Sequence, residues 1–242
     1  MTASGRRWWV LATAGLAQLM VVLDSTIVTI ALPSVQQDLG MGDSSRSWMI
    51  AAYALAFGGL LLLGGRLSDT FGARRTFVVG LIGFALASAL AGLAPTAGLL
   101  FAGRAGQGVF AALLAPAALA IISTTFAQPR ERGIAFGVYG ALTGAGAVIG
   151  LLLGGALTQY LDWRWCLLIN VPIASLALIG ARAVITHQPS RRGRVDLIGA
   201  ATSVVGMTAV VFALTEVANR GWVDPLVLGV SDGLCSEVLI GR

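Results

Sequence analysis

Residues 8–32 read WWVLATAGLAQLMVVLDSTIVTIAL, a run of 25 residues in which Asp24 is the one ionisable side chain. A helix needs about 20 predominantly apolar residues to cross the hydrocarbon core of a bilayer. Arg6 and Arg7 precede the run, as basic residues precede the hydrophobic core of a secretory signal peptide. The run is nevertheless too long for a signal-peptide core and lacks a small-residue cleavage site. The stretch therefore predicts a first membrane span that is retained.

Six further apolar runs follow, each long enough for a helix that crosses a membrane. The expected spans are residues 8–32, 47–65, 76–94, 97–126, 133–158, 165–185 and 196–217. An eighth run, 225–230, has only six residues and cannot cross. Short connections, of which Pro95-Thr96 is the shortest expected, make neighbouring helices antiparallel and adjacent.

A basic stretch that contains proline and serine, residues 187–194, marks a boundary along the chain. We expect a six-helix transmembrane bundle over 1–190. Residues 191–230 would hold the basic loop, an extra seventh helix and the start of an eighth, and 231–242 would form an aberrant tail. The expected fold class is all-α and integral to the membrane.

The composition excludes an ordinary soluble domain. Hydrophobic residues make up 57% of the chain, charged residues 11%, and the mean hydropathy is +0.85, whereas about 25% of the residues of soluble domains are charged. All 16 basic residues are arginines in short clusters between apolar runs, and binding of nucleic acid would need a continuous basic stripe instead. The expected partner of the chain is therefore a lipid bilayer.

The arginine clusters also predict the orientation. With the N-terminus in the cytoplasm, eleven arginines near the span ends fall inside and three fall outside. Membrane proteins carry such an excess of basic residues in their cytoplasmic loops. We therefore expect a multi-pass protein of the plasma (inner) membrane with a cytoplasmic N-terminus.

No group of residues indicates catalysis or metal binding. Cys166 lies in an apolar run, Cys235 lies in the tail, and the one histidine, His187, lies in a polar loop. Isolated cysteines indicate neither a disulfide framework nor a metal site. We expect no enzyme activity, no metal site and no cofactor.

Two ionisable residues lie well inside the spans, Asp24 in the first and Arg104 in the fourth. At 1.5 Å per residue, both lie roughly 10–12 Å below the outer boundary. A charge in lipid costs at least about 2.5–3.5 kcal/mol, so each is expected to face the bundle interior, where they can pair. The pair is either a structural tie between helices or part of a substrate or proton pathway, and we favour the pathway because intramembrane charges usually mark one.

The fifth expected span is rich in glycine. Small residues let membrane helices approach closely, so a stripe of glycines predicts tight contact with a neighbouring helix. The residues of this stripe are Gly140, Gly144, Gly146, Gly150, Gly154 and Gly155.

Five segments, in order along the chain, resemble motifs of the major facilitator superfamily. They are residues 23–33 (LDSTIVTIALP), 65–75 (GRLSDTFGARR), 104–108 (RAGQG), 146–155 (GAVIGLLLGG), and 163–165 (WRW) with 170–172 (NVP). The first and fourth segments are similar to those of the drug:proton antiporter family with fourteen spans. The resemblance covers roughly residues 8–230, and residues 231–242 match nothing expected there, so the chain looks like a truncated or frame-shifted N-terminal portion.

The resemblance implies a function and a set of site residues. The chain would be the N-terminal half of a proton-coupled efflux transporter for small lipophilic or cationic compounds, with Asp24 and Arg104 coupling inward proton movement to outward substrate movement. It implies a conformational latch that includes contacts with the missing C-terminal half, and a packing motif in helix five. The latch residues are Gly65, Asp69, Gly72, Arg74 and Arg75, and the motif residues are Gly146, Gly150, Gly154 and Gly155.

An alternative remains open, namely a non-transporting membrane module that assembles with another chain. In both cases we expect no transport by this chain alone, because alternating access needs two bodies that enclose a site. Six helices alone are also expected to leave Asp24 and Arg104 open to lipid or to another copy.

Overall fold

The computed structural model describes residues 3–186 together with 202, 205–206 and 209. Every secondary-structure element within residues 3–186 is an α-helix, as the apolar runs predict. The helices are α1 (Ala3–Asp38), α2 (Asp43–Phe71), α3 (Ala73–Gly92), α4 (Ala97–Thr125), α5 (Pro129–Tyr160), α6 (Arg164–Leu168) and α7 (Asn170–Val184).

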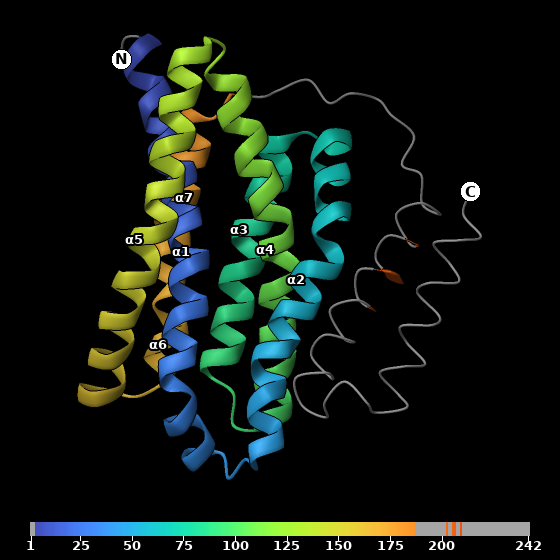
Figure 1. The fold of residues 1–242 in the computed structure, drawn as a ribbon, viewed down its shortest axis with the longest axis vertical. Helices are drawn as coiled ribbons and strands as arrows, with labels where there is room; N and C mark the ends of the chain where they lie inside the picture. Colours follow the sequence, from blue (N-terminus) through green and yellow to red (C-terminus); the bar gives the residue numbers. More distant parts are fainter. Residues whose placement is uncertain (1–2, 187–201, 203–204, 207–208, 210–242) are drawn as a thin grey trace, which may run out of the picture.

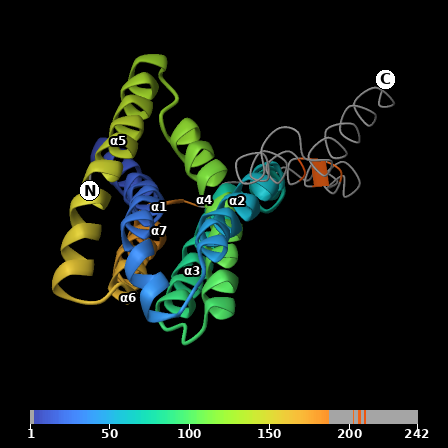
Figure 2. The same cartoon turned by 60° about the horizontal axis from the view of Figure 1, so that its bottom comes forward.

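Within the described residues, six helical stretches are long and apolar enough to cross a membrane, with α6 and α7 together forming the sixth. Helix α4 packs against α2 and α3, while α1 packs against α5 and α7. Contacts between α1 and α4 and between α3 and α7 join these two groups into one bundle (Figures 1 and 2). The predicted all-α, six-helix transmembrane bundle is confirmed.

The helices alternate in direction, so the connections gather at the two ends of the bundle (Figure 1). The start of α1, the α2–α3 and α4–α5 connections and the end of α7 lie at one end, which we call the arginine-rich end. It carries eight arginines, namely Arg6, Arg7, Arg66, Arg74, Arg75, Arg130, Arg132 and Arg182. In the described chain the opposite end has two, Arg46 and Arg164.

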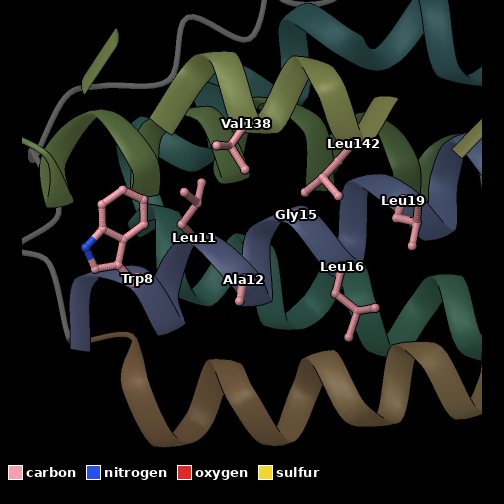
Figure 3. A pocket seen from close by; sticks show the side chains of 8 residues that line it. All are labelled: Trp8, Leu11, Ala12, Gly15, Leu16, Leu19, Val138 and Leu142. Atoms are coloured by element: carbon pink, nitrogen blue, oxygen red, sulfur yellow. The ribbon is translucent and has the colours of Figure 1, made fainter. Parts of the chain in front are cut away.

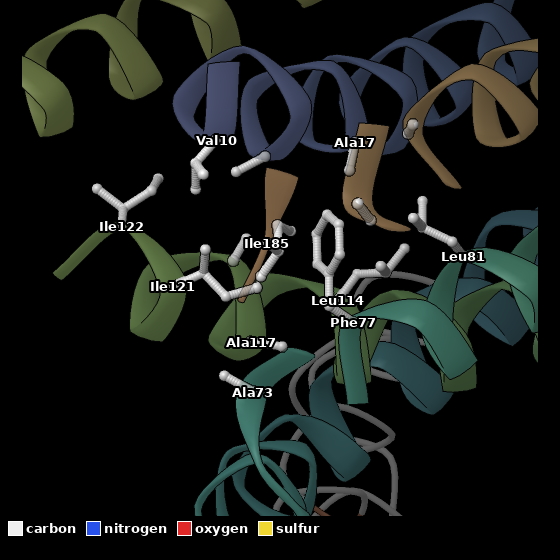
Figure 4. Close-up of a cluster of buried hydrophobic side chains, with 14 of the residues drawn as sticks. Val10, Ala17, Ala73, Phe77, Leu81, Leu114, Ala117, Ile121, Ile122 and Ile185 are labelled. Carbon is white, nitrogen blue, oxygen red and sulfur yellow. The ribbon is translucent and has the colours of Figure 1, made fainter. Parts of the chain in front are cut away.

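The apolar core lies where α1, α3, α4 and α7 meet. Phe77 and Leu81 of α3 pack with Leu114 and Ile121 of α4 and with Val10 of α1, all almost fully buried (Figure 4). Large apolar side chains on the outer faces of the same helices are exposed instead. A soluble protein rarely exposes so much contiguous apolar surface, whereas lipid accepts it.

One contact between α2 and α4 depends on glycine and proline together. Pro116 has no backbone N–H, so the carbonyl of Ala112, four residues earlier in α4, lacks its usual partner within the helix. A Cβ added at Gly64 of α2 would clash with this carbonyl oxygen. Only glycine lets the α2 backbone approach α4 so closely here.

Two predictions about the connections between spans were wrong. The expected spans 47–65 and 76–94 left residues 66–75 as a loop, yet α2 continues to Phe71 and α3 begins at Ala73, so Gly72 alone connects them. This connection, not Pro95-Thr96, is the shortest, because Gly72 adopts φ 91°, which side chains disfavour. The sixth span, expected at 165–185, lies at Arg164–Val184. The helix is interrupted within it at Ile169, since Pro172 cannot donate to the carbonyl of Leu168.

The predicted seventh helix at 196–217, the eighth run and the tail at 231–242 lie almost entirely outside the described residues. The division of the chain at residue 190 therefore stays a prediction.

Candidate functional site

The two charges predicted to pair do so at the centre of the bundle. The Nη1 atom of Arg104 donates to Oδ2 of Asp24 over 2.6 Å, and the two side chains are 2% and 0% exposed. This burial corrects the expectation that six helices alone would leave the pair open to lipid. The reason is that α3 and α7 supply the further polar groups that enclose the pair.

Two amide side chains complete the hydrogen bonding of Asp24. Its Oδ1 atom accepts from Nε2 of Gln107 over 2.8 Å and from Nδ2 of Asn170 over 2.7 Å. Gln107 also accepts from Arg104 Nη1 over 2.7 Å and donates to the Ser88 hydroxyl over 2.7 Å. These five residues, Asp24, Ser88, Arg104, Gln107 and Asn170, form what we call the central polar cluster, which links α1, α3, α4 and α7.

An aromatic ring extends the cluster to α2. The guanidinium carbon of Arg104 lies 4.6 Å from the centroid of the Tyr53 ring, a distance at which a cation is attracted to the face of a ring. Gly108 on α4 permits this approach of α2, and Gly103 permits a similarly close approach of α3. A Cβ at Gly103 would lie 2.7 Å from that of Ala91 on α3, and one at Gly108 would clash with the carbonyl oxygen of Tyr53.

The cluster keeps two unused hydrogen-bonding atoms. Oδ1 of Asn170 and Nε of Arg104 are buried and have no hydrogen-bond partner among the described residues. Leaving a buried polar group unpaired costs about 1–3 kcal/mol. The site therefore has one unpaired acceptor and one unpaired donor, and a different arrangement of the cluster can provide both with hydrogen-bond partners.

Three of the cluster's five residues were missed as partners from the sequence. Gln107 and Asn170 appeared only as letters of motifs, and Ser88 did not stand out in its apolar span. All three are 0% exposed. Their signal is a polar side chain inside an apolar run, but the sequence does not reveal which of these side chains meet.

The proposed latch residues lie at the arginine-rich end, away from the cluster. Asp69 is in the last turn of α2 and exposed, while Arg74 and Arg75 are in the first turn of α3. Thr76 donates to the Gly72 carbonyl over 3.3 Å and thereby fixes the turn. Gly65 faces α4, where a Cβ would lie 3.9 Å from that of Pro116.

The glycines of α5 divide into two groups. Gly146, Gly150 and Gly154 are buried against α1, where added Cβ atoms would meet Val22, Thr26 and Ile27. At Gly140, Gly144 and Gly155, in contrast, an added Cβ would have no described atom within 4 Å. The stripe that packs is therefore the i, i+4, i+8 set, which lies on one face of a helix.

A second polar group bridges α1 and α5 beside an apolar cavity. Tyr139 donates to Oε1 of Gln18 over 2.6 Å, and Nε2 of Gln18 donates to Thr143 over 3.3 Å. The cavity has a volume of about 520 Å³, and its walls include Leu16 and Leu142 (Figure 3). This volume lies within the range of about 300–1,000 Å³ typical of small-molecule sites.

Residues 14–233 match the family described as the Major Facilitator Superfamily. The chain is 61% identical over 224 residues to the puromycin resistance protein pur8 of Streptomyces alboniger, a match that covers 92% of this chain and 44% of that protein. It is 42% identical over 215 residues to the cephamycin export protein CmcT of Amycolatopsis lactamdurans, covering 88% and 44%. The chain thus spans about half the length of the curated relatives it matches.

Solved structures share the fold at low identity. A bacterial homolog of the human lysosomal transporter Spinster, in an inward-facing and unoccupied conformation, matches with a TM-score of 0.62 and 20% identity over 79% of this chain and 46% of that one. A peptide transporter, POT, matches with a TM-score of 0.67 and 16% identity over 90% and 48%. From the family match and this shared helical fold, the chain belongs to the Major Facilitator Superfamily.

Proposed function

We propose that this chain is the N-terminal half of a proton-coupled exporter of small lipophilic or cationic compounds, of the drug:proton antiporter family with fourteen spans. Relatives named for antibiotic resistance and export support the export function. The observation that carries the coupling is Asp24, the only fully buried acid among the five in residues 3–186 whose burial the structure describes. Buried ionisable groups in membrane proteins mark ion and proton pathways.

The cluster gives protonation of Asp24 a mechanical consequence. As a carboxylate, Asp24 accepts from Arg104, Gln107 and Asn170 and so ties α1 to α4 and α7. A proton on Asp24 removes the charge that compensates Arg104 and weakens these charge-assisted hydrogen bonds. Protonated and charged Asp24 therefore favour different helix arrangements, and a proton shifts a conformational equilibrium only through such a difference.

The α2–α3 connection is our proposed latch. Gly65, Asp69, Gly72, Arg74 and Arg75 would stabilise one conformation through contacts with a C-terminal half. The single-residue turn at Gly72 supports this role because it holds Asp69 and Arg74 at fixed positions on two helix ends. The packed glycines of α5 would keep α1 and α5 moving as one body.

The cavity between α1 and α5 supports a lipophilic substrate. Its walls are apolar, and Gln18 and Tyr139 supply hydrogen-bonding groups that bridge the same two helices. Pockets for small molecules have a mostly apolar lining, and here Gln18 and Tyr139 lie beside the cavity and do not line it. We infer that neutral or singly charged aromatic compounds suit this half better than highly polar ones.

A chimera tests the proposal. This chain replaces the matching part of the puromycin resistance protein, and export of puromycin from cells is measured with and without a protonophore. We expect export that the protonophore stops and that Asp24→Asn abolishes at equal membrane abundance. Asp38→Asn, the same change at the exposed end of the same helix, is the control and should retain export. Protonophore-sensitive export by the Asp24→Asn chimera would contradict the coupling role.

The second candidate function is a membrane module that assembles with another chain. The described helices form one bundle, and alternating access needs two bodies around the substrate. Inverted vesicles that contain this chain alone should not accumulate a fluorescent lipophilic cation above empty vesicles. Protonophore-sensitive accumulation would contradict this and imply that two copies replace two halves.

The orientation is also a proposal, with the arginine-rich end in the cytoplasm. Single cysteines at Gly5 and Gly193 should resist a membrane-impermeant thiol reagent in intact cells, whereas one at Gly42 should react. Labelling of the cysteine at position 193 but not of the one at position 42 would contradict the proposed orientation.

A further inference from the structure

Helices α3 and α7 each carry an exposed apolar stripe. On α3 the stripe runs through Val79, Ile82, Leu86, Leu90 and Leu93, of which Leu86 and Leu93 are 66% and 68% exposed. On α7, Leu176 and Ile179 are 61% and 66% exposed. Residues at these spacings share one face of a helix. Both faces belong to membrane-spanning helices, and both are therefore surfaces for lipid acyl chains.

Each stripe ends in an arginine at the arginine-rich end. Arg75 precedes Val79 by one helical turn, and Arg182 follows Ile179 by three residues in the last turn of α7. Both arginines are exposed, and together with Arg74 they line a cavity of about 340 Å³ between the two helices. That volume is roughly ten times the ~30 Å³ that a water molecule occupies in the liquid, so a hydrated phosphate group fits.

In the part of the chain that the structure describes, these three guanidinium groups have no negative partner, since no acidic side chain there forms an ion pair with Arg74, Arg75 or Arg182. The Nε atom of Arg74 is buried and has no hydrogen-bond partner there. Guanidinium groups bind phosphate through two parallel N–H bonds, so the cavity is complementary to a phosphate in charge, and the Arg74 Nε–H is a donor left unpaired among the described residues.

A second cavity distinguishes a phospholipid from free phosphate. Its volume is also about 340 Å³, and it shares Arg75 and Val79 with the first cavity. Leu67, Phe71, Thr76 and Leu113 line the rest of it, and the lining surface is almost entirely apolar. An acyl chain fits such a lining, whereas an inorganic ion gains nothing from it.

We propose that Arg74, Arg75 and Arg182 bind the phosphate of an anionic phospholipid in the leaflet at the arginine-rich end, with an acyl chain along Val79 and Phe71. Basic pockets between transmembrane helices bind anionic headgroups in this way. A zwitterionic lipid binds less well, because its own ammonium group is repelled by the three arginines. The site shares Arg74 and Arg75 with the proposed latch. It is separate from the central polar cluster and does not depend on which compound is exported.

The test uses the full 242-residue chain, purified in a neutral detergent, with bound lipid counted by native mass spectrometry. Phosphatidylglycerol and phosphatidylcholine with identical acyl chains are titrated separately. We expect one tightly bound phosphatidylglycerol per chain and no comparable binding of phosphatidylcholine. Arg182→Gln should weaken the binding about five-fold, the effect of one basic residue near an anionic lipid surface, and Arg182→Glu should abolish it.

Arg132→Gln and Arg132→Glu are the matched controls, since Arg132 is exposed at the same end but does not line either cavity. Equal losses of phosphatidylglycerol binding in the Arg132 and Arg182 variants would show diffuse attraction to the basic end of the bundle. That result would overturn the proposal of a specific site. Inorganic phosphate at millimolar concentration should not displace the lipid, and displacement would assign the cavity to a free anion. Binding unchanged in Arg182→Glu would also overturn it. Arg182 is exposed, and unfolding curves without lipid confirm that each variant is folded.

Discussion

Two ion pairs of the same length hold different parts of this bundle. Arg104–Asp24 joins α4 to α1, Arg7–Glu131 joins α1 to α5, and in each an arginine Nη1 lies 2.6 Å from a carboxylate oxygen. The surroundings differ. The first pair is 2% and 0% exposed, whereas the second is 36% and 34% exposed. Length alone therefore does not tell which pair carries function.

Burial changes what each pair contributes. The exposed pair has water as an alternative partner, so its contribution to stability is about 0–1 kcal/mol. The buried pair has no such alternative, and each charge depends on the other and on Gln107 and Asn170. A proton that arrives at Asp24 consequently perturbs the packing of four helices, while one at Glu131 perturbs only a surface contact.

The largest expected effect comes from breaking the buried pair on one side. Arg104→Gln leaves Asp24 buried without a compensating charge, which should lower the free energy of unfolding by about 3–5 kcal/mol. Equilibrium unfolding in mixed micelles measures it. Arg7→Gln, the same substitution in the exposed pair, is the control, and equal losses in the two variants would remove the distinction between the pairs.

A smaller loss of unfolding free energy should come from replacing a glutamine beside the buried pair, Gln107, with leucine. Gln107→Leu removes a donor to Asp24 and Ser88 inside the bundle. Asp24 keeps its bonds from Arg104 and Asn170, so Ser88 is the buried group left unpaired, at a cost of about 1–3 kcal/mol.

Gln18, between α1 and α5, is the partly buried counterpart. Gln18→Leu removes the amide that Tyr139 and Thr143 contact there. Thr143 keeps its bond to the Tyr139 carbonyl, so a smaller loss is expected. A larger loss of unfolding free energy from Gln18→Leu than from Gln107→Leu would show that burial does not rank these contacts.

The smallest effect is the response of the exposed pair to salt. Charges in contact with water are screened within about 3 Å at 1 M salt, whereas buried pairs are screened much less. The stability difference between wild type and Arg7→Gln, below about 1 kcal/mol at low salt, should therefore vanish at 1 M salt. The stability difference between wild type and Arg104→Gln should remain at 1 M salt. A salt-independent Arg7 effect would contradict the assignment of that pair to the surface.

The span pattern predicted the helices well because a bilayer demands long apolar runs. It missed the turn at Gly72 and the break at Ile169, since both depend on how single residues, Gly72 and Pro172, constrain the backbone. The depths of Asp24 and Arg104 predicted their contact. Their enclosure by Ser88, Gln107 and Asn170 could not be predicted, because it depends on how α3 and α7 pack around α1 and α4.

The same limit applies to the glycines of α5. Sequence spacing marked six positions as one packing stripe, yet only Gly146, Gly150 and Gly154 face α1. Helical periodicity would have separated Gly155 from Gly154 by about 100° around the helix axis. Which of the possible faces meets a neighbour was not encoded in the spacing.

Neutralising both partners of the buried pair in the chimera tests the coupling claim most directly. Asp24→Asn together with Arg104→Gln leaves no unpaired charge, so most of the stability lost in either single variant should return. Proton-driven puromycin export against a concentration gradient is then compared at equal membrane abundance. A coupling role predicts a stable double variant that equilibrates puromycin but no longer exports it uphill. A stable double variant that still exports uphill, and stops when a protonophore is added, would make the pair a structural tie between helices.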